Sequence, residues 1–152
     1  MTNKSAAKGS RFEYSIRDLL TKKTGVEWER VPMSGAGTMK GDLYCPTNHY
    51  YYCFECKSFA DSVISENLLT AKSNNFYSWW DQTTREATQM NRKAALVFKK
   101  DRGKPLVAVV EDIQGINKFS LVSNLGETYV DVNIYLFEDW LSKKSVEELI
   151  LI

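Results

Sequence analysis

Three polar residues, Asp42, Glu55 and Lys57, have the types and spacing that suit metal-dependent hydrolysis of a phosphodiester bond. Glu55 and Lys57 are two positions apart, so on a β-strand their side chains leave the same face roughly 6 to 7 Å apart. If a hairpin brings Asp42 alongside, two carboxylates and an ammonium group converge on one point. Carboxylate oxygens suit Mg²⁺, and a lysine beside the ion can orient a water molecule or stabilise charge on phosphorus.

The simpler interpretation of an acidic residue two positions before a lysine is a solvated ion pair on an exposed strand. The setting of Glu55 and Lys57 argues against it. Residues 50–54 are aromatic and β-forming, which predicts a largely buried strand that ends at these charged residues. Unpaired charges are costly near a buried face, so the setting favours a catalytic or metal-binding role.

Length and composition indicate one globular domain. The chain has 152 residues, of which 43% are hydrophobic and 26% are charged, as in ordinary soluble proteins. No uninterrupted apolar run approaches the roughly 18 residues of a membrane span, and residues 1–5 lack a signal-peptide core. We therefore expect a single domain over residues 1–152, located in the cytoplasm and without a membrane partner.

Three cysteines and one histidine lie close together in the sequence and could suggest zinc. An odd number of cysteines in a domain of this size favours reduced thiols. Cys53 and Cys56 are three positions apart on the expected strand, so their side chains point to opposite faces. Zinc ligands converge on one tetrahedron, and we therefore expect no zinc site here.

The net charge of +1 is unevenly distributed. Basic residues outnumber acidic ones by eight to four in residues 1–40 and by eight to three in residues 72–104. Acidic residues outnumber basic ones by four to one in residues 41–71, which contain the proposed site, and by eight to three in residues 105–152. Two basic segments beside an acidic one suit a surface that follows a phosphate backbone around a metal site. Scattered solvated faces would give the same counts.

The two basic segments supply candidate contacts to a nucleic-acid backbone. These are Lys4, Lys8, Arg11, Lys40, Arg85 and Arg92. The first two belong to residues 1–8, which are polar and which we expect to form a flexible arm. The last two share a polar stripe of an expected helix with Gln82 and Gln89, and a solvated helix face is the default explanation of that stripe.

Local patterns predict the elements around the proposed site. Ser10 is typical of an N-cap, and it opens a helix that ends near Gly25. Glu13 completes a capping box with Ser10, which is its structural role in this interpretation. Residues 26–32 alternate as a half-exposed strand, and residues 33–41 form a glycine-bearing loop that leads into the aspartate.

The second half of the chain predicts a helix and several strands. Residues 59–75 are polar and irregular, so we expect a mobile insert there. Residues 76–90 indicate a helix whose aromatics, Phe76, Trp79 and Trp80, are more typical of a core or a dimer interface than of a base-stacking platform. The remaining chain predicts a buried strand over 94–98, a turn over 101–105, a strand over 106–110, weaker strands within 117–135, a short helix over 137–142 and a capping box at Ser145.

With these elements in order, the sequence resembles the PD-(D/E)xK nuclease superfamily and, within it, the archaeal-type Holliday junction resolvases, whether as a cellular or a viral member. The resemblance covers roughly residues 8 to 100. It is carried by Lys8-Gly9-Ser10-Arg11-Phe12-Glu13, Arg30-Val31-Pro32-Met33-Ser34-Gly35, Gly41-Asp42, Phe54-Glu55-Cys56-Lys57-Ser58, and Gln82 ahead of the Leu96-Val97-Phe98 strand. Two features depart from the archaeal pattern: glycine replaces proline before the aspartate, and residues 59–80 are longer.

The resemblance implies an α/β fold with a restriction-endonuclease-like core, in which a central mixed β-sheet is flanked by helices. It also implies a site for one or two Mg²⁺ ions, for which Mn²⁺ substitutes. Asp42 and Glu55 would be the metal ligands, and Glu13 would reach the metal through water. Lys57 would position or activate the attacking water. Ser34 would touch the scissile phosphate region.

The implied activity is that of a structure-selective DNA endonuclease that resolves four-way junctions by paired symmetric cuts, with Gln82 as a further member of the catalytic set. Two symmetric cuts require a homodimer with two facing sites, and the aromatics of residues 76–90 are interface candidates. Two alternatives stay open. One is a nuclease on linear or otherwise branched duplex DNA, of the repair or restriction type, and the other is a catalytically silent DNA-binding module on the same fold.

Overall fold

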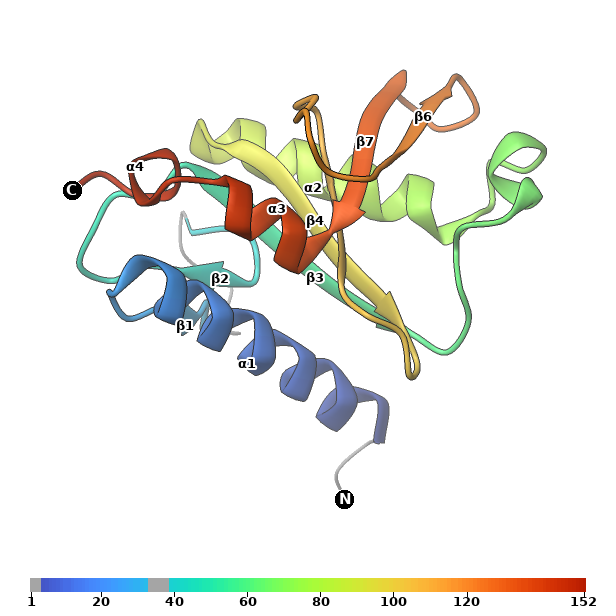
Figure 1. The fold of residues 1–152 in the computed structure, drawn as a ribbon. Coiled ribbons are helices and arrows are strands. Elements are labelled where there is room, and N and C mark those ends of the chain that lie inside the picture. The colour runs from blue at the N-terminus through green and yellow to red at the C-terminus, as the bar shows by residue number, and fades with distance from the viewer. Residues whose placement is uncertain (1–3, 33–38) are drawn as a thin grey trace.

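The fold is built on one mixed sheet of seven strands, seen in a computed structural model that describes residues 4–32 and 39–152, the side chains of residues 4–6 excepted (Figure 1). The strands lie in the order β1-β2-β3-β4-β5-β7-β6. They are β1 (Glu29–Arg30), β2 (Leu43–Tyr44), β3 (Tyr52–Phe59), β4 (Lys93–Lys100), β5 (Leu106–Val109), β6 (Phe119–Ser123) and β7 (Val130–Leu136). The helices are α1 (Lys4–Thr24), the short 3₁₀ helix η1 (Glu66–Leu69), α2 (Asn75–Met90), α3 (Phe137–Lys143) and α4 (Val146–Leu149).

The central strands β3 and β4 run parallel, and the other neighbouring pairs in the described sheet are antiparallel. Tyr52 lies beside Lys93 and Phe59 lies beside Lys100, so the two strands pair over their full length. Parallel neighbours need a crossover connection, and the segment that contains η1 and α2 supplies it. The crossover lays α2 against one face of β3 and β4.

The two faces of β3 carry different side chains because residues alternate along a strand. Tyr52, Phe54 and Cys56 point into the larger core cluster, to which α1 and α3 also contribute. Glu55 and Lys57 therefore point to the opposite face, where α2 packs. The second core cluster lies on that opposite face, between α2 and the strands from β4 to β7.

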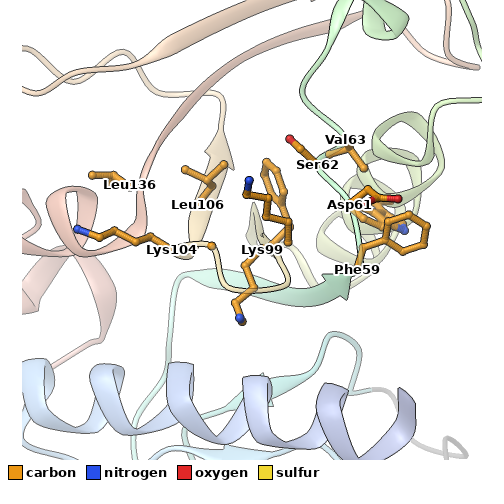
Figure 2. A pocket seen from close by; sticks show the side chains of 12 residues that line it. Phe59, Asp61, Ser62, Val63, Lys99, Lys104, Leu106 and Leu136 are labelled. Atoms are coloured by element: carbon orange, nitrogen blue, oxygen red, sulfur yellow. The ribbon is translucent and has the colours of Figure 1, made fainter. Parts of the chain in front are cut away.

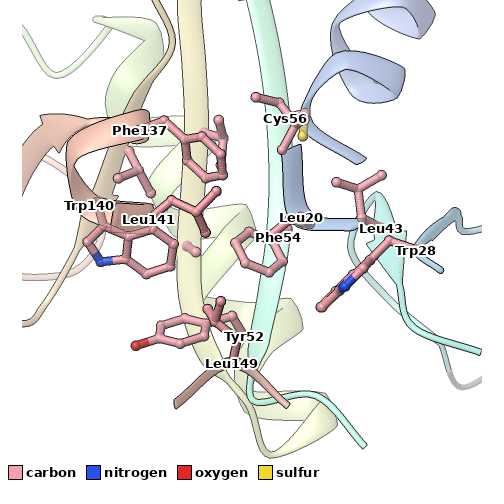
Figure 3. Close-up of a cluster of buried hydrophobic side chains, with 14 of the residues drawn as sticks. Leu20, Trp28, Leu43, Tyr52, Phe54, Cys56, Phe137, Trp140, Leu141 and Leu149 are labelled. Carbon is pink, nitrogen blue, oxygen red and sulfur yellow. The ribbon is translucent and has the colours of Figure 1, made fainter. Parts of the chain in front are cut away.

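Aromatic packing holds β3 in place on its apolar face. Figure 3 shows Phe54 between Trp28 and Trp140, with ring centroids 5.7 Å and 6.3 Å away in edge-to-face geometry. The Tyr52 ring lies 5.2 Å from that of Trp140. All four side chains are buried. Because aromatic cores of this kind are close-packed, the strand that carries Glu55 and Lys57 has little freedom to move.

Helix α1 differs from its predicted start. It begins at Lys4, so most of the expected flexible arm is helical, and Ser10 lies inside the helix rather than at its cap. Gly9 weakens a helix by about 1 kcal/mol, but the buried apolar face of α1 offsets that loss. Lys8 also forms an ion pair with Asp101 at 2.9 Å, which ties the first turns to the β4–β5 turn. Tertiary contacts, rather than a local cap, set where this helix begins.

Most of the other predicted elements are confirmed. The expected helices at 76–90 and 137–142, the strand pair across the turn at 101–105 and the capping box at Ser145 are all present. The strand expected at 26–32 is reduced to the two residues of β1. None of the described helices combines the length and the apolar character needed to cross a membrane.

The insert expected at residues 59–75 contains η1, which is capped by the Ser65 side chain. Val63 and Leu68 are buried in the second core cluster. The Asn74 side chain donates a hydrogen bond to the Val63 carbonyl at 3.0 Å. These contacts anchor the insert to α2, and its mobility stays a prediction.

Replacing Phe54 by alanine should destabilise the protein by about 3 to 5 kcal/mol, because a buried aromatic side chain is lost from a close-packed core. The control is Phe119→Ala, since Phe119 is 59% exposed on the edge strand β6 and its truncation removes little packing. Urea denaturation followed by tryptophan fluorescence measures both. Equal losses in the two variants would contradict the packing described for β3.

Candidate active site

Asp42 is held beside β3 by the backbone. Its amide donates to the Phe54 carbonyl at 2.7 Å, and its carbonyl accepts from the Val31 amide at 2.9 Å. Gly41 has a φ of +83°, and a Cβ there would lie 2.9 Å from Cys53 Sγ and 3.0 Å from the Phe54 carbonyl oxygen. A glycine is therefore required at this close approach of two chain segments. The antiparallel pairing of β2 with β3 meets the condition stated for the sequence, since it brings Asp42 next to β3.

The Asp42 side chain reaches the middle of β3. Its Oδ2 accepts a hydrogen bond from the Cys56 amide at 2.7 Å. Strand β2 pairs with β3 only through Leu43 and Phe54, so the Cys56 amide binds a carboxylate in place of a neighbouring strand. This hydrogen bond sets Asp42 beside Glu55 and Lys57, the two residues that flank Cys56 in sequence.

Glu55 is only 3% exposed. Burial, hydrogen bonding with Glu86 and the charge of Asp42 together raise the pKa of Glu55 to about 11. Burial also raises the pKa of Asp42, although the Cys56 amide opposes the shift. Without a bound cation, Glu55 therefore keeps a proton at neutral pH. Carboxyl groups behave in this way when they are crowded together with too little positive charge.

Glu86 on α2 is a third carboxyl group at the site, and no motif indicated it. Its Oε1 accepts a hydrogen bond from Gln82 Nε2 at 3.3 Å, and its Oε2 is buried without a partner of ordinary hydrogen-bond geometry in the described chain. Burial raises the pKa of Glu86, but hydrogen bonds from Glu55, Gln82 and the Gly41 amide outweigh burial and lower this pKa. Glu55 thus carries the proton of the pair and Glu86 carries the charge.

Glu86 could have been found from the sequence by its spacing. It follows Gln82 by four residues, so the two side chains share one face of α2. The polar stripe expected along this helix ran from Gln82 through Arg85, which is exposed, and did not include Glu86. The helix pattern alone does not show that α2 packs on β3, and this packing brings Glu86 close to Glu55, 31 positions earlier in the sequence.

Lys57 supplies positive charge at the site. It is half-buried on β3 and lies two residues after Glu55, on the same face. Burial raises the pKa of Glu13 and of Asp42, and the positive charge of Lys57 opposes both shifts. One ammonium group therefore faces several carboxyl groups, and the site remains short of positive charge.

Glu13 lies near the site on α1, and Arg30 holds it. Arg30 Nε donates a hydrogen bond to Glu13 Oε2 at 2.5 Å. Burial and the charge of Asp42 raise the pKa of Glu13, and Arg30 opposes this shift. The capping box predicted for Glu13 is wrong because Ser10 lies inside α1. Arg30 therefore positions the Glu13 carboxylate, a role that the local sequence pattern did not predict.

Of the remaining predicted site residues, one contacts the site and two lie outside the part of the chain that the structure describes. Gln82 belongs to the site through its hydrogen bond to Glu86. Ser34 lies outside the described residues, as does the side chain of Lys4. The roles assigned to these three residues stay predictions.

The other expected DNA contacts lie on several elements. Arg11 on α1 and Arg85 on α2 are exposed, and Lys40, ahead of Asp42, is half-buried. Lys8 is engaged with Asp101 in an exposed ion pair, which is weak enough to open for a phosphate.

Arg92 has structural contacts of its own. Its guanidinium lies 4.7 Å from the centre of the Tyr50 ring, and its NH1 donates to the Met90 carbonyl at 2.9 Å. These contacts direct Arg92 along the end of α2 and favour a packing role for it over the predicted contact with DNA.

The donor set fits a hard divalent cation. In the described part of the chain, no three His, Cys, Asp or Glu side chains already form a ready coordination shell. Asp42, Glu55 and Glu86 nevertheless lie close enough to shift one another's pKa, with a proton held at Glu55. A divalent cation that replaced this proton would balance the charge of the three carboxyl groups. Mg²⁺ keeps several waters and needs few protein ligands, so this set suits it.

Comparison with known proteins agrees with the class of enzyme that this site suggests. A family model described as "Phage putative PDDEXK endonuclease" matches residues 4–150. Protein D14 of Escherichia phage T5 is 43% identical over 155 residues, which cover 96% of this chain and 97% of that protein. No solved structure gave a match. The chain belongs to this phage PD-(D/E)xK endonuclease family, and its helix-flanked mixed sheet confirms the fold class expected from the sequence.

Replacing Glu86 by glutamine should destabilise the metal-free protein at neutral pH by about 1 kcal/mol, or roughly 2 to 4 °C in Tm, because the hydrogen bonds that lower the pKa of Glu86 stabilise its charged form in the folded protein. The same change should reduce the further rise in Tm on adding Mg²⁺. Thermal melts in EDTA and in Mg²⁺ measure both effects, with the exposed Glu127→Gln as the control. A normal response of E86Q to Mg²⁺ would remove Glu86 from the cation site.

The raised pKa of Glu55 predicts a pH effect on stability. The folded protein holds the proton more tightly than the unfolded chain, so folding stability falls as pH rises above the unfolded pKa of about 4.5. In EDTA, wild-type protein should lose stability relative to Glu55→Gln between about pH 5 and about pH 8. Urea denaturation at several pH values tests this, and a constant difference between the two proteins would contradict the shift.

Proposed function

We propose that the protein is a Mg²⁺-dependent DNA endonuclease that hydrolyses phosphodiester bonds, with four-way junctions as its substrate. The observation that carries the proposal is the position of Asp42 beside the buried Glu55 and the half-buried Lys57 of β3, where negative charge exceeds positive charge. Membership of a phage endonuclease family supports the nuclease activity. Mn²⁺ is expected to substitute for Mg²⁺, and the host cytoplasm is the proposed location.

The residues of the site have distinct roles in this proposal. Asp42 and Glu55 would hold the ion, which supplies charge to polarise the phosphate and to acidify a bound water. The Cys56 amide keeps the Asp42 carboxylate in place before any ligand arrives. Lys57 orients the attacking water or stabilises the charge that develops on the phosphate oxygens. Preorganised groups of this kind need no rearrangement at the moment of reaction.

Three further residues would support this set. Glu86, which accepts a hydrogen bond from Gln82, would complete the ligands from the side of α2. Glu13, which accepts a hydrogen bond from Arg30, would bind a metal-coordinated water from the side of α1. Ser34 keeps its proposed contact with the scissile phosphate region.

The choice of a junction as substrate rests on the resemblance to resolvases and on the exposed basic residues Arg11 and Arg85. Paired cuts in a junction require two copies of the site, so a homodimer belongs to the proposal. Phe76 and Trp80, predicted as interface residues, are 0% and 3% exposed and belong to the core of one chain. That part of the prediction is wrong because both side chains pack between α2 and the sheet. Trp79, the third predicted interface residue, is half-buried, and its role in a dimer stays a prediction.

Asp42→Asn, Glu55→Gln and Lys57→Ala should each lower the rate of DNA cutting by about a hundredfold or more, because each removes a charge from the reacting centre. Binding to the same DNA should be preserved. Gel assays of a labelled synthetic junction in Mg²⁺ and in EDTA measure cutting and binding side by side. Normal turnover in any of the three variants would exclude that residue from the chemistry.

Substrate choice is tested with the junction and a duplex of matched sequence. The proposal expects faster cutting of the junction, and it expects a dimer by light scattering at micromolar protein. Equal cutting of both DNAs would favour a repair or restriction nuclease. A monomer that cuts would contradict junction resolution and leave the nuclease activity standing. Binding without cutting at every Mg²⁺ concentration would favour a silent DNA-binding module.

A further inference from the structure

A line of side chains connects the proposed active site to an aromatic pocket. On β3, Glu55, Lys57 and Phe59 share one face because they are spaced by two. Glu55 and Phe59 are therefore separated by about 13 Å along the strand, and Lys57 lies halfway. The strand thus leads directly from the carboxyl groups to Phe59.

Helix α2 supplies a second line that faces the first. Trp79, Gln82 and Glu86 are spaced by three and four residues, so they share one helix face. The two lines meet at both ends. The carboxyl groups of Glu86 and Glu55 lie close enough at one end to shift each other's pKa, and at the other end the Trp79 and Phe59 rings pack edge to face with centroids 5.9 Å apart.

The pocket at the second end has a volume of about 200 Å³. Figure 2 shows Phe59 and Val63 on one side of it and Lys104 and Leu106 on the other. Phe59 is 41% exposed although it is a large aromatic residue. The volume is below the roughly 300 to 1,000 Å³ of pockets for drug-sized ligands, so the pocket suits a single planar ring better than an extended peptide.

Basic side chains border this apolar pocket. Lys100 and Lys104 belong to its lining, as does the acidic Asp61. Lys99 also touches it, but Lys99 alternates with Lys100 along β4 and so directs its side chain to the opposite face of the sheet. The pocket therefore carries an excess of positive charge, whereas the carboxyl groups at Glu55 leave an excess of negative charge. The Asp101 amide donates to the Phe59 carbonyl at 2.9 Å, so the basic β4–β5 turn is fixed directly beside the pocket.

We propose that this pocket binds an unpaired nucleobase of the DNA strand, close to the phosphate that is cut. The Phe59 ring stacks on the base, and the lysines hold the adjoining phosphate, as on surfaces that bind single-stranded nucleic acid. This inference rests on the proposed function and adds to it a physical source of selectivity. Removing a base from its stack is least costly where the DNA is already unpaired, so the pocket favours branched or frayed DNA over intact duplex.

The test uses binding alone, in EDTA, and is therefore independent of cutting. The probe is a duplex with a short single-stranded flank that contains 2-aminopurine, and the reference is the same duplex with blunt ends. Phe59→Ala should weaken binding of the flanked probe by about five- to a hundredfold. Binding of the blunt duplex should stay within about twofold.

Three further variants control for folding and for general charge. Phe59→Trp should retain binding of the flanked probe and its change in 2-aminopurine fluorescence, because the stacking surface is kept. Lys104→Gln, an exposed change, should lower the salt dependence of that binding by about one unit of slope. Phe119→Ala removes an exposed aromatic residue at the far edge of the sheet and should change nothing.

Equal effects of Phe59→Ala on binding of both DNAs, or no effect on either, would overturn the proposal that the pocket binds a nucleobase and would assign the pocket to an occupant other than DNA. So would a Lys104→Gln variant with an unchanged salt slope. Failure of the proposed nuclease would appear differently, as absence of cutting by wild-type protein in Mg²⁺ with the binding difference intact.

Discussion

Three carboxyl groups placed together beside one ammonium group leave negative charge that the protein alone does not neutralise. The pKa of Glu55 is raised far above its ordinary value, so Glu55 keeps a proton at neutral pH. Glu86 stays charged because it accepts hydrogen bonds from its neighbours. Such an arrangement is unfavourable for folding without a ligand. In the proposed function, a divalent cation takes the place of the proton and makes the arrangement favourable. The excess of negative charge and the proposed binding of a cation then have the same origin.

The fold keeps these groups together through packing on the opposite face of β3. Phe54 and Tyr52 are fixed among aromatic rings, and the alternation of the strand then directs Glu55 and Lys57 the other way. The parallel pairing of β3 with β4 requires the crossover that contains α2, and α2 delivers Glu86. Gly41 allows the chain to approach β3 closely enough for Asp42 to reach the Cys56 amide. Each contribution comes from a different element, and β3 is common to all of them.

The sequence predicted what depends on local pattern. The proximity of Asp42, Glu55 and Lys57 was predictable because two of them lie on one strand and the third follows a glycine-bearing loop, and the helix at 76–90 was predictable from its periodicity. Long-range contacts decided the rest. Helix α1 extends past Ser10 because its apolar face is buried. Glu86 reaches the site only because α2 packs on β3. The packing of α2 on the sheet also buries Trp80.

The most direct measurement is a crystal soaked in Mn²⁺ and recorded for anomalous scattering. The account predicts a peak between the carboxyl groups of Asp42 and Glu55, at the roughly 2.0 to 2.2 Å from their oxygens that is usual for ions of this size. Glu86 should lie against the same peak, and the Lys57 ammonium should lie nearby without touching the ion. A crystal with these side chains turned apart, and with no anomalous density among them, would contradict the account.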